Sequence, residues 1–332
     1  MTRLFRSFSW GALPALLGLA VVTRGCATVT IVSPGAAARF PQAPGALAAW
    51  SVLADAPLLS ALADASLVVL VGFFAAASLQ ACRLANAGTL PAYLSLLLAS
   101  AALAWMDLGA GALAALVTVG AAHQLYGAYR QQGDSLPVFN AGFLVGLAWL
   151  LSAPFVWMVG WAFVTLSQLR TPRGRDFVGL LLGVMTLPLL WGMAAYVFGD
   201  LSAALPRLTD GVARLPTLEG LRQNALPLAV LAGATLLALG AFGRLTTRRT
   251  VQEQRAHRLY YTMLPFAWAA VLLSGPPPEH PEVAFSPAPL LPALSVLLGV
   301  YLLELPRRPA NVLLAAATLA VLGAHAYAIL AT

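Results

Sequence analysis

Long apolar runs follow one another along the whole chain, and clusters of arginine separate them at alternate breaks. Hydrophobic residues make up 60% of the 332 residues, and charged residues make up only 9%. A water-soluble fold of this composition has too few polar side chains to cover its surface. A helix that crosses a bilayer needs about 20 mainly apolar residues, so the pattern predicts an all-α, polytopic membrane protein with a single helical bundle.

We predict eleven spans from the apolar runs and the breaks between them. They cover residues 8–23, 65–82, 90–106, 109–128, 136–152, 155–169, 177–198, 226–245, 259–274, 289–304 and 309–330. Pro154 marks a tight turn between the fifth span and the sixth. Since no soluble domain or repeat interrupts the series, residues 1–332 are predicted to form one integral membrane domain.

The distribution of charge orients the predicted bundle. All 19 basic residues are arginine, and with the N-terminus in the cytoplasm fourteen of them fall on the inner side. Eight of the 12 acidic residues fall on the outer side. An excess of basic residues in short cytoplasmic loops is typical of membrane proteins. We therefore predict a bacterial inner (cytoplasmic) membrane location, with a cytoplasmic N-terminus and a periplasmic C-terminus.

The formal net charge of +7 does not indicate nucleic-acid binding, because the arginines cluster at the ends of spans and form no basic face or arm. The partners predicted are membrane lipids and other membrane proteins, and no nucleic acid. The sequence contains no Walker loop, no dinucleotide fingerprint and no histidine pair for haem, so no cofactor and no metal are predicted.

Three predicted outer loops are long enough to hold structure, at residues 25–64, 199–225 and 275–289. The first ends in two amphipathic pieces, one around Trp50 and one after Pro57, of the kind that lies in a membrane interface. The second mixes arginines with acids. The third contains six prolines and is predicted to be extended.

Asp55 and Asp64 are the candidate catalytic residues, because both lie in the first outer loop near the membrane surface. A carboxylate there could hold a divalent cation or act as a general base. A structural role is the alternative. Asp55 stands just before Pro57 and could cap one helix, while Asp64 could cap the second span.

Arg24, His123 and Asn140 are the candidate residues for a substrate or a lipid phosphate. Arg24 closes the first span on the outer side, where a guanidinium group could bind a phosphate in bidentate fashion or simply snorkel to the interface. His123 lies one turn inside the cytoplasmic end of the fourth span, where it could relay a proton or join an interfacial polar cluster. Asn140 lies on the fifth span and completes this polar set.

Two pairs of glycines have the small-xxx-small spacing that lets membrane helices approach closely. They are Gly142 with Gly146, and Gly179 with Gly183. Glu304 lies one turn before Arg307 and Arg308, a spacing that favours a local ion pair.

Several short segments resemble an uncharacterised family of multi-pass inner-membrane proteins of Gram-negative bacteria, which is described only as a domain of unknown function. The segments are Arg3–Ser7 with Arg24, Phe139–Ala148, the Pro154 turn, Leu169–Pro172 and Arg175-Asp176. The chain departs from the family pattern at Ser9-Trp10. The resemblance implies the same membrane topology, and it implies no activity and no catalytic residue.

The layout also resembles that of polyprenyl-phosphate-sugar-dependent membrane glycosyltransferases, in which an outer loop of amphipathic helices follows the first span. In that class the catalytic acid lies early in the loop, whereas here Gly25–Trp50 contains no acid and Asp55 is the first.

Three functions follow as alternatives. The first is a non-enzymatic component of envelope biogenesis, which the shortage of polar residues within the spans favours. The second is a glycosyltransferase-like enzyme at the outer face, with Arg24 on the phosphate and Asp55 or Asp64 as acid, base or metal ligand. The third is a transporter of a lipid or a hydrophobic solute, with Arg24, Asn140 and His123 along its path.

Overall fold

The fold is seen in a computed structural model. It describes residues 16, 57–82, 89–100, 109–130, 134–169, 173–197, 212, 215–240, 250–274 and 285–331. Within these ranges the regular structure is helical and contains no β-strand, so the all-α prediction is confirmed for the described part of the chain.

Ten long helices occupy the described ranges, and each coincides with one predicted span from the second to the eleventh. They are α4 (Pro57–Ala81), α5 (Leu90–Ser100), α6 (Gly109–Arg130), α7 (Leu136–Leu151), α8 (Trp157–Leu169), α9 (Gly174–Val197), α12 (Ala225–Gly240), α14 (Val251–Leu273), α15 (Leu291–Glu304) and α16 (Arg307–Ala331). A short helix, α11 (Leu218–Gln223), lies in the second predicted outer loop. Of the first predicted span only Leu16 is described, and it is helical and fully buried.

Two helices begin about two turns earlier than predicted. Helix α4 begins at Pro57 and takes in the end of the predicted outer loop 25–64, so the amphipathic piece and the second span form one helix. Proline suits the first turn of a helix, because its missing N–H needs no partner there. Helix α14 begins at Val251, because Thr250 and Glu253 form a reciprocal capping box.

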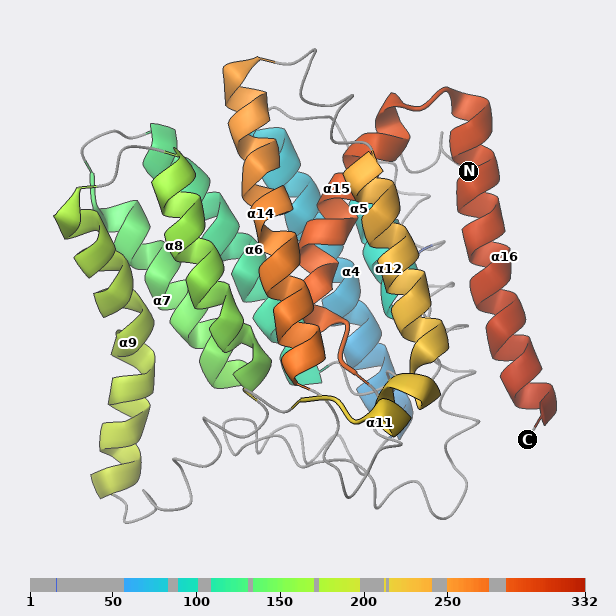
Figure 1. The fold of residues 1–332 in the computed structure, drawn as a ribbon, viewed down its shortest axis with the longest axis horizontal. Helices are drawn as coiled ribbons and strands as arrows, with labels where there is room; N and C mark the ends of the chain where they lie inside the picture. The colour runs from blue at the N-terminus through green and yellow to red at the C-terminus, as the bar shows by residue number, and fades with distance from the viewer. Residues whose placement is uncertain are drawn as a thin grey trace.

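The predicted turn at Pro154 is confirmed. Helix α7 ends where the N–H of Ser152 donates to the carbonyl of Ala148 at 3.0 Å. A 3-10 turn, η3 (Ala153–Val156), follows and contains Pro154. Helix α8 begins directly after it, so this short connection sets α7 and α8 as antiparallel neighbours (Figure 1).

The long helices run alternately up and down in the view of Figure 1. Helices α7, α9, α14 and α16 begin at the upper end of the molecule, and helices α6, α8, α12 and α15 finish there. Helix α9 lies at the left edge of this view and α16 at the right edge. The ends predicted to be cytoplasmic therefore lie together at one end of the described bundle.

Helices α5 and α15 form the centre of the bundle. Every residue of α5 is buried, and so is almost every residue of α15, because α4, α6, α12, α14 and α16 contact one or both of them. A helix that is apolar on all sides must be buried in protein or in lipid. Gly72 of α4 contacts the backbone of Ala92 in α5 and makes this close packing feasible.

Helices α7 and α9 form the most extensive helix pair and run parallel. A Cβ atom on Gly142 would lie 2.3 Å from the Leu180 oxygen, one on Gly146 would lie 2.3 Å from the Val184 oxygen, and one on Gly183 would lie 2.3 Å from the Phe139 oxygen. Close packing at these three glycines is therefore confirmed.

The same prediction is wrong for Gly179, because a Cβ atom there would meet nothing within 4 Å. The buried residues of α9 are Asp176, Leu180, Gly183, Val184 and Pro188. Gly179 lies beside this stripe and not on it.

Pro188 explains why one of these close approaches involves the Val184 carbonyl. Proline has no N–H, so it cannot donate the usual helical hydrogen bond to the carbonyl four residues earlier, which is that of Val184. The backbone of Gly146 lies against that oxygen. A Cα–H group can make a weak hydrogen bond to such a carbonyl.

Candidate functional site

Two of the candidate site residues, Arg24 and Asp55, lie outside the described residues. Their predicted roles at the outer face stay predictions.

Asp64 lies within α4, seven residues after its first residue, Pro57. It therefore does not cap the second span, since a capping residue must stand at the start of a helix. Its side chain is not among those described, so the catalytic role stays a prediction.

His123 and Asn140 lie at the same end of a helix pair. Helices α6 and α7 are extensively packed, and a Cβ atom on Gly120 of α6 would contact the Leu144 side chain of α7 at 3.4 Å. Since α6 runs up and α7 runs down in Figure 1, His123 and Asn140 lie at similar heights, near the upper end. The His123 side chain is exposed and that of Asn140 is half-buried.

A polar junction joins α6, α8 and α14 at this upper end. Arg255 of α14 donates from Nη1 to the carbonyl of Leu169, the last residue of α8, at 2.8 Å. Its guanidinium carbon also lies 4.6 Å from the centre of the Tyr129 ring of α6. A cation at the C-terminus of a helix is favoured by the helix dipole, and a cation over an aromatic face is favoured by the ring quadrupole. Arg255 therefore holds three helix ends together.

Helices α8 and α14 are further joined along their length. The Trp161 indole Nε1 donates to the carbonyl of Leu259 at 3.0 Å, and the hydroxyls of Thr165 and Thr262 lie 3.2 Å apart. Trp161 is fully buried. A hydrogen bond within a protein typically contributes about 1 kcal/mol net, so these contacts position α14 more than they stabilise it.

Asp176 is a buried acid at the start of α9, with 2% of its side chain exposed. Its Oδ2 accepts from the backbone N–H of Arg173 at 3.1 Å, and its Oδ1 lies 4.0 Å from Nε of Arg175. A carboxylate at a helix N-terminus is favoured by the dipole. Asp176 therefore fixes the beginning of α9 at the upper end of the bundle.

A buried polar group lies between α4 and α14. His257 is fully buried, and Tyr260 follows it by nearly one turn on the same helix. The Tyr260 hydroxyl is hydrogen-bonded to Ser78 of α4, and the buried Cys82 lies near it. His257 was not a candidate residue from the sequence, because residues up to 258 were predicted to form an inner loop.

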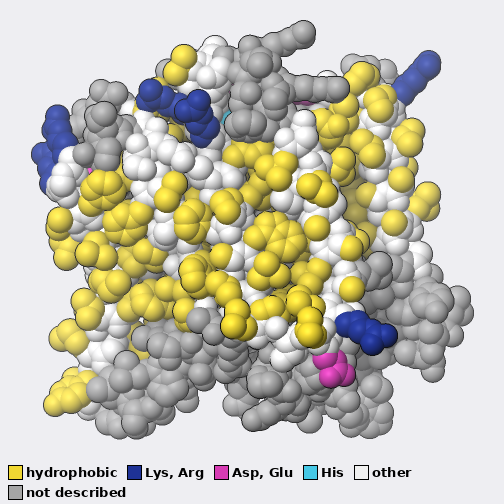
Figure 2. All heavy atoms as spheres, viewed as in Figure 1, with side chains coloured by type: hydrophobic (Ala, Val, Ile, Leu, Met, Phe, Trp, Pro, Cys, Tyr) yellow, Lys and Arg dark blue, Asp and Glu magenta, His cyan; other side chains and the backbone are white. Residues whose placement is uncertain are grey.

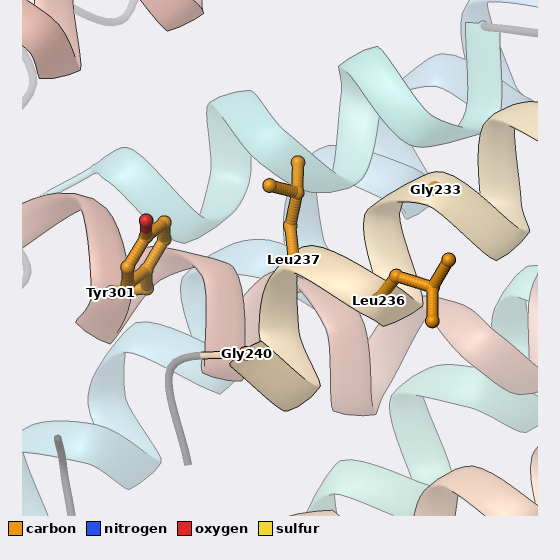
Figure 3. A pocket seen from close by; sticks show the side chains of 5 residues that line it. All are labelled: Gly233, Leu236, Leu237, Gly240 and Tyr301. Atoms are coloured by element: carbon orange, nitrogen blue, oxygen red, sulfur yellow. The ribbon is translucent and has the colours of Figure 1, made fainter. Parts of the chain in front are cut away.

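An open apolar groove of about 450 Å³ lies between α12 and α15. Gly233, Leu236, Leu237, Gly240 and Tyr301 line it, and Figure 3 shows these residues. The sequence did not predict the groove, because the spacing of Gly233 and Gly240 does not indicate which helix lies beside them.

Residues of α14 fix the back of α12 behind this groove. The Tyr261 hydroxyl donates to the carbonyl of Ala238 at 2.9 Å, and the Trp268 indole Nε1 donates to the Thr235 hydroxyl at 3.1 Å. These bonds hold α12 in place while its opposite face stays open.

The surface of the described bundle is apolar between its two ends. Figure 2 shows hydrophobic side chains across the middle of one face, with basic side chains mainly at the upper end and one basic and acidic group at the lower end. Large hydrophobic side chains are exposed on α9, α12 and α16, among them Leu189 at 62%, Leu236 at 69% and Leu319 at 69%.

Helix α9 is the one described helix that is long and apolar enough to cross a membrane by length and composition. Its 24 residues span about 36 Å at 1.5 Å per residue. Only 22% of its most apolar window is buried, whereas a core helix of a water-soluble protein would be mostly buried. Seven shorter apolar helical stretches of 10–17 residues accompany it among the described residues.

Within the described ranges, no three His, Cys, Asp or Glu side chains lie together in a way that could hold a metal ion. Comparison with known proteins adds no relative, since no protein-family model, no curated protein and no solved structure matches the chain. The resemblance to the inner-membrane family stays a prediction.

Proposed function

We propose that the chain is a multi-pass protein of a bacterial inner membrane and acts there as a non-enzymatic component of envelope biogenesis. In this proposal eleven helices cross the bilayer, the N-terminus is cytoplasmic and the C-terminus is periplasmic. The upper end of the bundle in Figure 1 then faces the cytoplasm.

The single observation that carries the membrane proposal is the exposed apolar surface of the peripheral helices. On α9 alone, seven large hydrophobic side chains are more than half exposed: Val178, Leu182, Leu189, Leu190, Met193, Tyr196 and Val197. Soluble monomers rarely expose contiguous apolar patches of more than a few hundred Å², because water disfavours them. Lipid acyl chains solvate such a surface without cost.

The position of the charged side chains supports the proposed orientation. Arg173, Arg175, Arg255, Arg258 and Arg308 lie in the first or second turns of helices that begin at the upper end, or just before them. Arg222, by contrast, lies on α11 at the lower end. An excess of arginine at one end is what membrane insertion produces on the cytoplasmic side.

The packed centre of the bundle supports a structural component over a transporter. Helices α5 and α15 fill the middle of the described bundle with apolar side chains, and the hydroxyl of the buried Ser95 bonds to the carbonyls of Val68 and Ala92. A solute carried through the bundle would need an open path along these helices, and their buried side chains fill that space in the described part of the chain.

Membrane insertion is tested by fractionation and by reporter fusions. The protein should stay in the membrane pellet after an alkaline wash and should need detergent for extraction. A fusion after residue 130 should report the cytoplasm, and a fusion after residue 200 should report the periplasm. If both fusions reported the cytoplasm, or if the protein were recovered without detergent, the proposal would be refuted.

The role in envelope biogenesis is tested in a deletion strain. The strain should show an envelope defect, and in-cell crosslinking should capture a membrane-protein partner. Asp55→Asn with Asp64→Asn should complement the defect fully, and so should Arg24→Ala with His123→Ala. Loss of complementation by the first pair would favour the transferase, and loss by the second pair together with lost uptake would favour the transporter.

A further inference from the structure

Two arginines of α14 lie on the side of this helix that packs against α8. Arg255 and Arg258 are three residues apart, so they lie on the same side of α14. Thr262 continues this side one turn after Arg258, and its hydroxyl lies 3.2 Å from that of Thr165 in α8. Arg255 is half-buried, whereas Arg258 is exposed.

No acid in the described part of the chain neutralises these two arginines. The Arg255 guanidinium contacts a carbonyl and an aromatic ring, and no described carboxylate forms an ion pair with it or with Arg258. Glu253, two residues before Arg255, accepts from the backbone N–H of Thr250 in the capping box. Because two guanidinium groups one turn apart repel each other, this surface favours a bound anion.

The end of α8 lies beside these arginines. Arg255 bonds to Leu169, the last residue of α8, and the two helices run antiparallel (Figure 1). Arg258 is therefore at about the height of residues 167–168 of α8, where Gln168 is exposed. The amide of Gln168 adds a hydrogen-bond donor to the basic surface.

Below this polar end, the same edge of the two helices is apolar. Val164 precedes Gln168 by one turn and is 38% exposed, and Pro265 is exposed two turns after Arg258. Figure 2 shows the same order on its visible face, with basic side chains at the upper end above an apolar belt. We call this edge, with Arg258 and Gln168 at its upper end and Val164 and Pro265 below them, the α8–α14 seam.

We propose that the α8–α14 seam binds an anionic phospholipid of the phosphatidylglycerol type. Arg258 binds the phosphate, Arg255 supplies a second positive charge beside it, and an acyl chain lies along Val164 and Pro265. The inference rests on the proposed membrane location and adds a lipid and its site to it.

The charge of the seam selects an anionic headgroup over a zwitterionic one. The planar guanidinium group of Arg258 can bind two oxygens of any phospholipid phosphate. A zwitterionic headgroup also brings a cationic group, which two arginines without an acid repel, whereas a phosphatidylglycerol headgroup brings none. One arginine near an anionic membrane surface strengthens binding about fivefold, so its loss is measurable.

The charge can be removed without disturbing the fold, because the Arg258 side chain is exposed. Arg258→Gln removes the charge, and Arg258→Lys keeps the charge but not the two parallel hydrogen bonds. Arg308→Gln is the matched control, since Arg308 is also exposed and lies in the first turn of α16, at the same end of the bundle. Helix α16 lies at the right edge of Figure 1, away from α8.

The test is photolabelling of the full-length protein in phosphatidylcholine vesicles that contain a trace of phosphatidylglycerol with a diazirine in one acyl chain. Adducts are mapped by proteolysis and mass spectrometry. The wild type and Arg308→Gln should be labelled at the seam on α8 and α14, and a phosphatidylcholine probe with the same acyl chain should label it less. Arg258→Gln should lower the phosphatidylglycerol label at the seam about fivefold, and Arg258→Lys should lower it less.

Equal labelling of the seam by the two probes, or an unchanged label in Arg258→Gln, would overturn the inference. So would loss of the label on addition of millimolar inorganic phosphate at constant ionic strength, because the seam would then be a site for a free anion. A protein crosslinked in cells through a photoreactive residue at position 168, with no lipid adduct in vesicles, would assign the seam to a protein partner instead. Failure of the protein to insert into vesicles would refute the proposed membrane location, which separates the two failures.

Discussion

Replacing Gly183 of α9 by alanine tests the packing of α7 against α9. The new Cβ atom would lie 2.3 Å from the Phe139 oxygen and 2.8 Å from the Phe143 nitrogen, both of them backbone atoms that cannot rotate away. A carbon and an oxygen in contact lie about 3.3 Å apart or more, so the two helices must separate by about 1 Å.

This separation lowers the free energy of unfolding in a way that can be worked out from the contacts it weakens. Overpacking of a close contact typically destabilises a fold by about 1–3 kcal/mol. A gap of this size also loosens the close backbone approaches at Gly142 and Gly146, where a weak Cα–H···O bond would be worth about 0.5–1 kcal/mol each. Alanine recovers up to about 1 kcal/mol through its higher helix propensity. The expected net loss for Gly183→Ala is therefore about 2–3 kcal/mol.

Gly179→Ala is the matched control on the same helix. Its Cβ atom would meet nothing within 4 Å, so the variant keeps the packing and gains helix propensity alone. We expect its stability to equal or exceed that of the wild type by up to about 1 kcal/mol.

Thermal unfolding of the detergent-solubilised protein provides the assay. The chain has two cysteines, so the assay uses a Cys26→Ser background in which the buried Cys82 reacts with a thiol-specific fluorophore only when the bundle opens, and fluorescence reports the Tm. Gly183→Ala should lower the Tm by about 3–4 °C, since the entropy of unfolding grows with chain length, and Gly179→Ala should not lower it. An unchanged Tm for Gly183→Ala, or an equal fall for both variants, would refute the reasoning.

Three further predictions concern helix ends, and the same unfolding assay checks each of them. Arg255→Ala should lower the free energy of unfolding by about 1–2 kcal/mol, because it removes the hydrogen bond to the end of α8 and the contact with the Tyr129 ring. The control Arg258→Ala changes an exposed side chain and should lower it by less than about 0.5 kcal/mol, so equal losses in the two variants would contradict the junction. Thr250→Ala should lower the free energy of unfolding by about 1 kcal/mol, because it removes the N-cap of α14, whereas Thr250→Ser keeps a capping hydroxyl and should be as stable as the wild type. A serine variant as unstable as the alanine variant would argue against the cap. Asp176→Ala should lower the free energy of unfolding by about 1–2 kcal/mol, because the start of α9 loses the acceptor for the Arg173 N–H and a negative charge that the helix dipole favours. A Tm equal to that of the wild type would contradict this role.

The helices themselves were predictable from the sequence, because helix formation depends on local composition. Each of the ten long described helices falls on a predicted apolar run, and the turn at Pro154 lies where the proline placed it. The misplaced boundaries also have local causes. The capping box at Thr250 and Glu253 was readable in the sequence and could have extended α14 by two turns.

The pairing of helices was not predictable in the same way, because it depends on how each helix is rotated about its axis. The sequence marks Gly179 and Gly183 alike, yet only Gly183 faces α7. A rotation of α9 by part of a turn would exchange their roles without changing any local preference.

The candidate site shows the same division. Composition and charge alone predicted helices in the strongly apolar segments, with arginine at alternate breaks, since these properties belong to each segment separately. The contact of Arg255 with the ends of α6 and α8, the groove beside Tyr301 and the position of Asp64 within α4 depend on how far a helix extends and on which helices are neighbours. Such features join residues distant in sequence, so they exist only once the helices are packed.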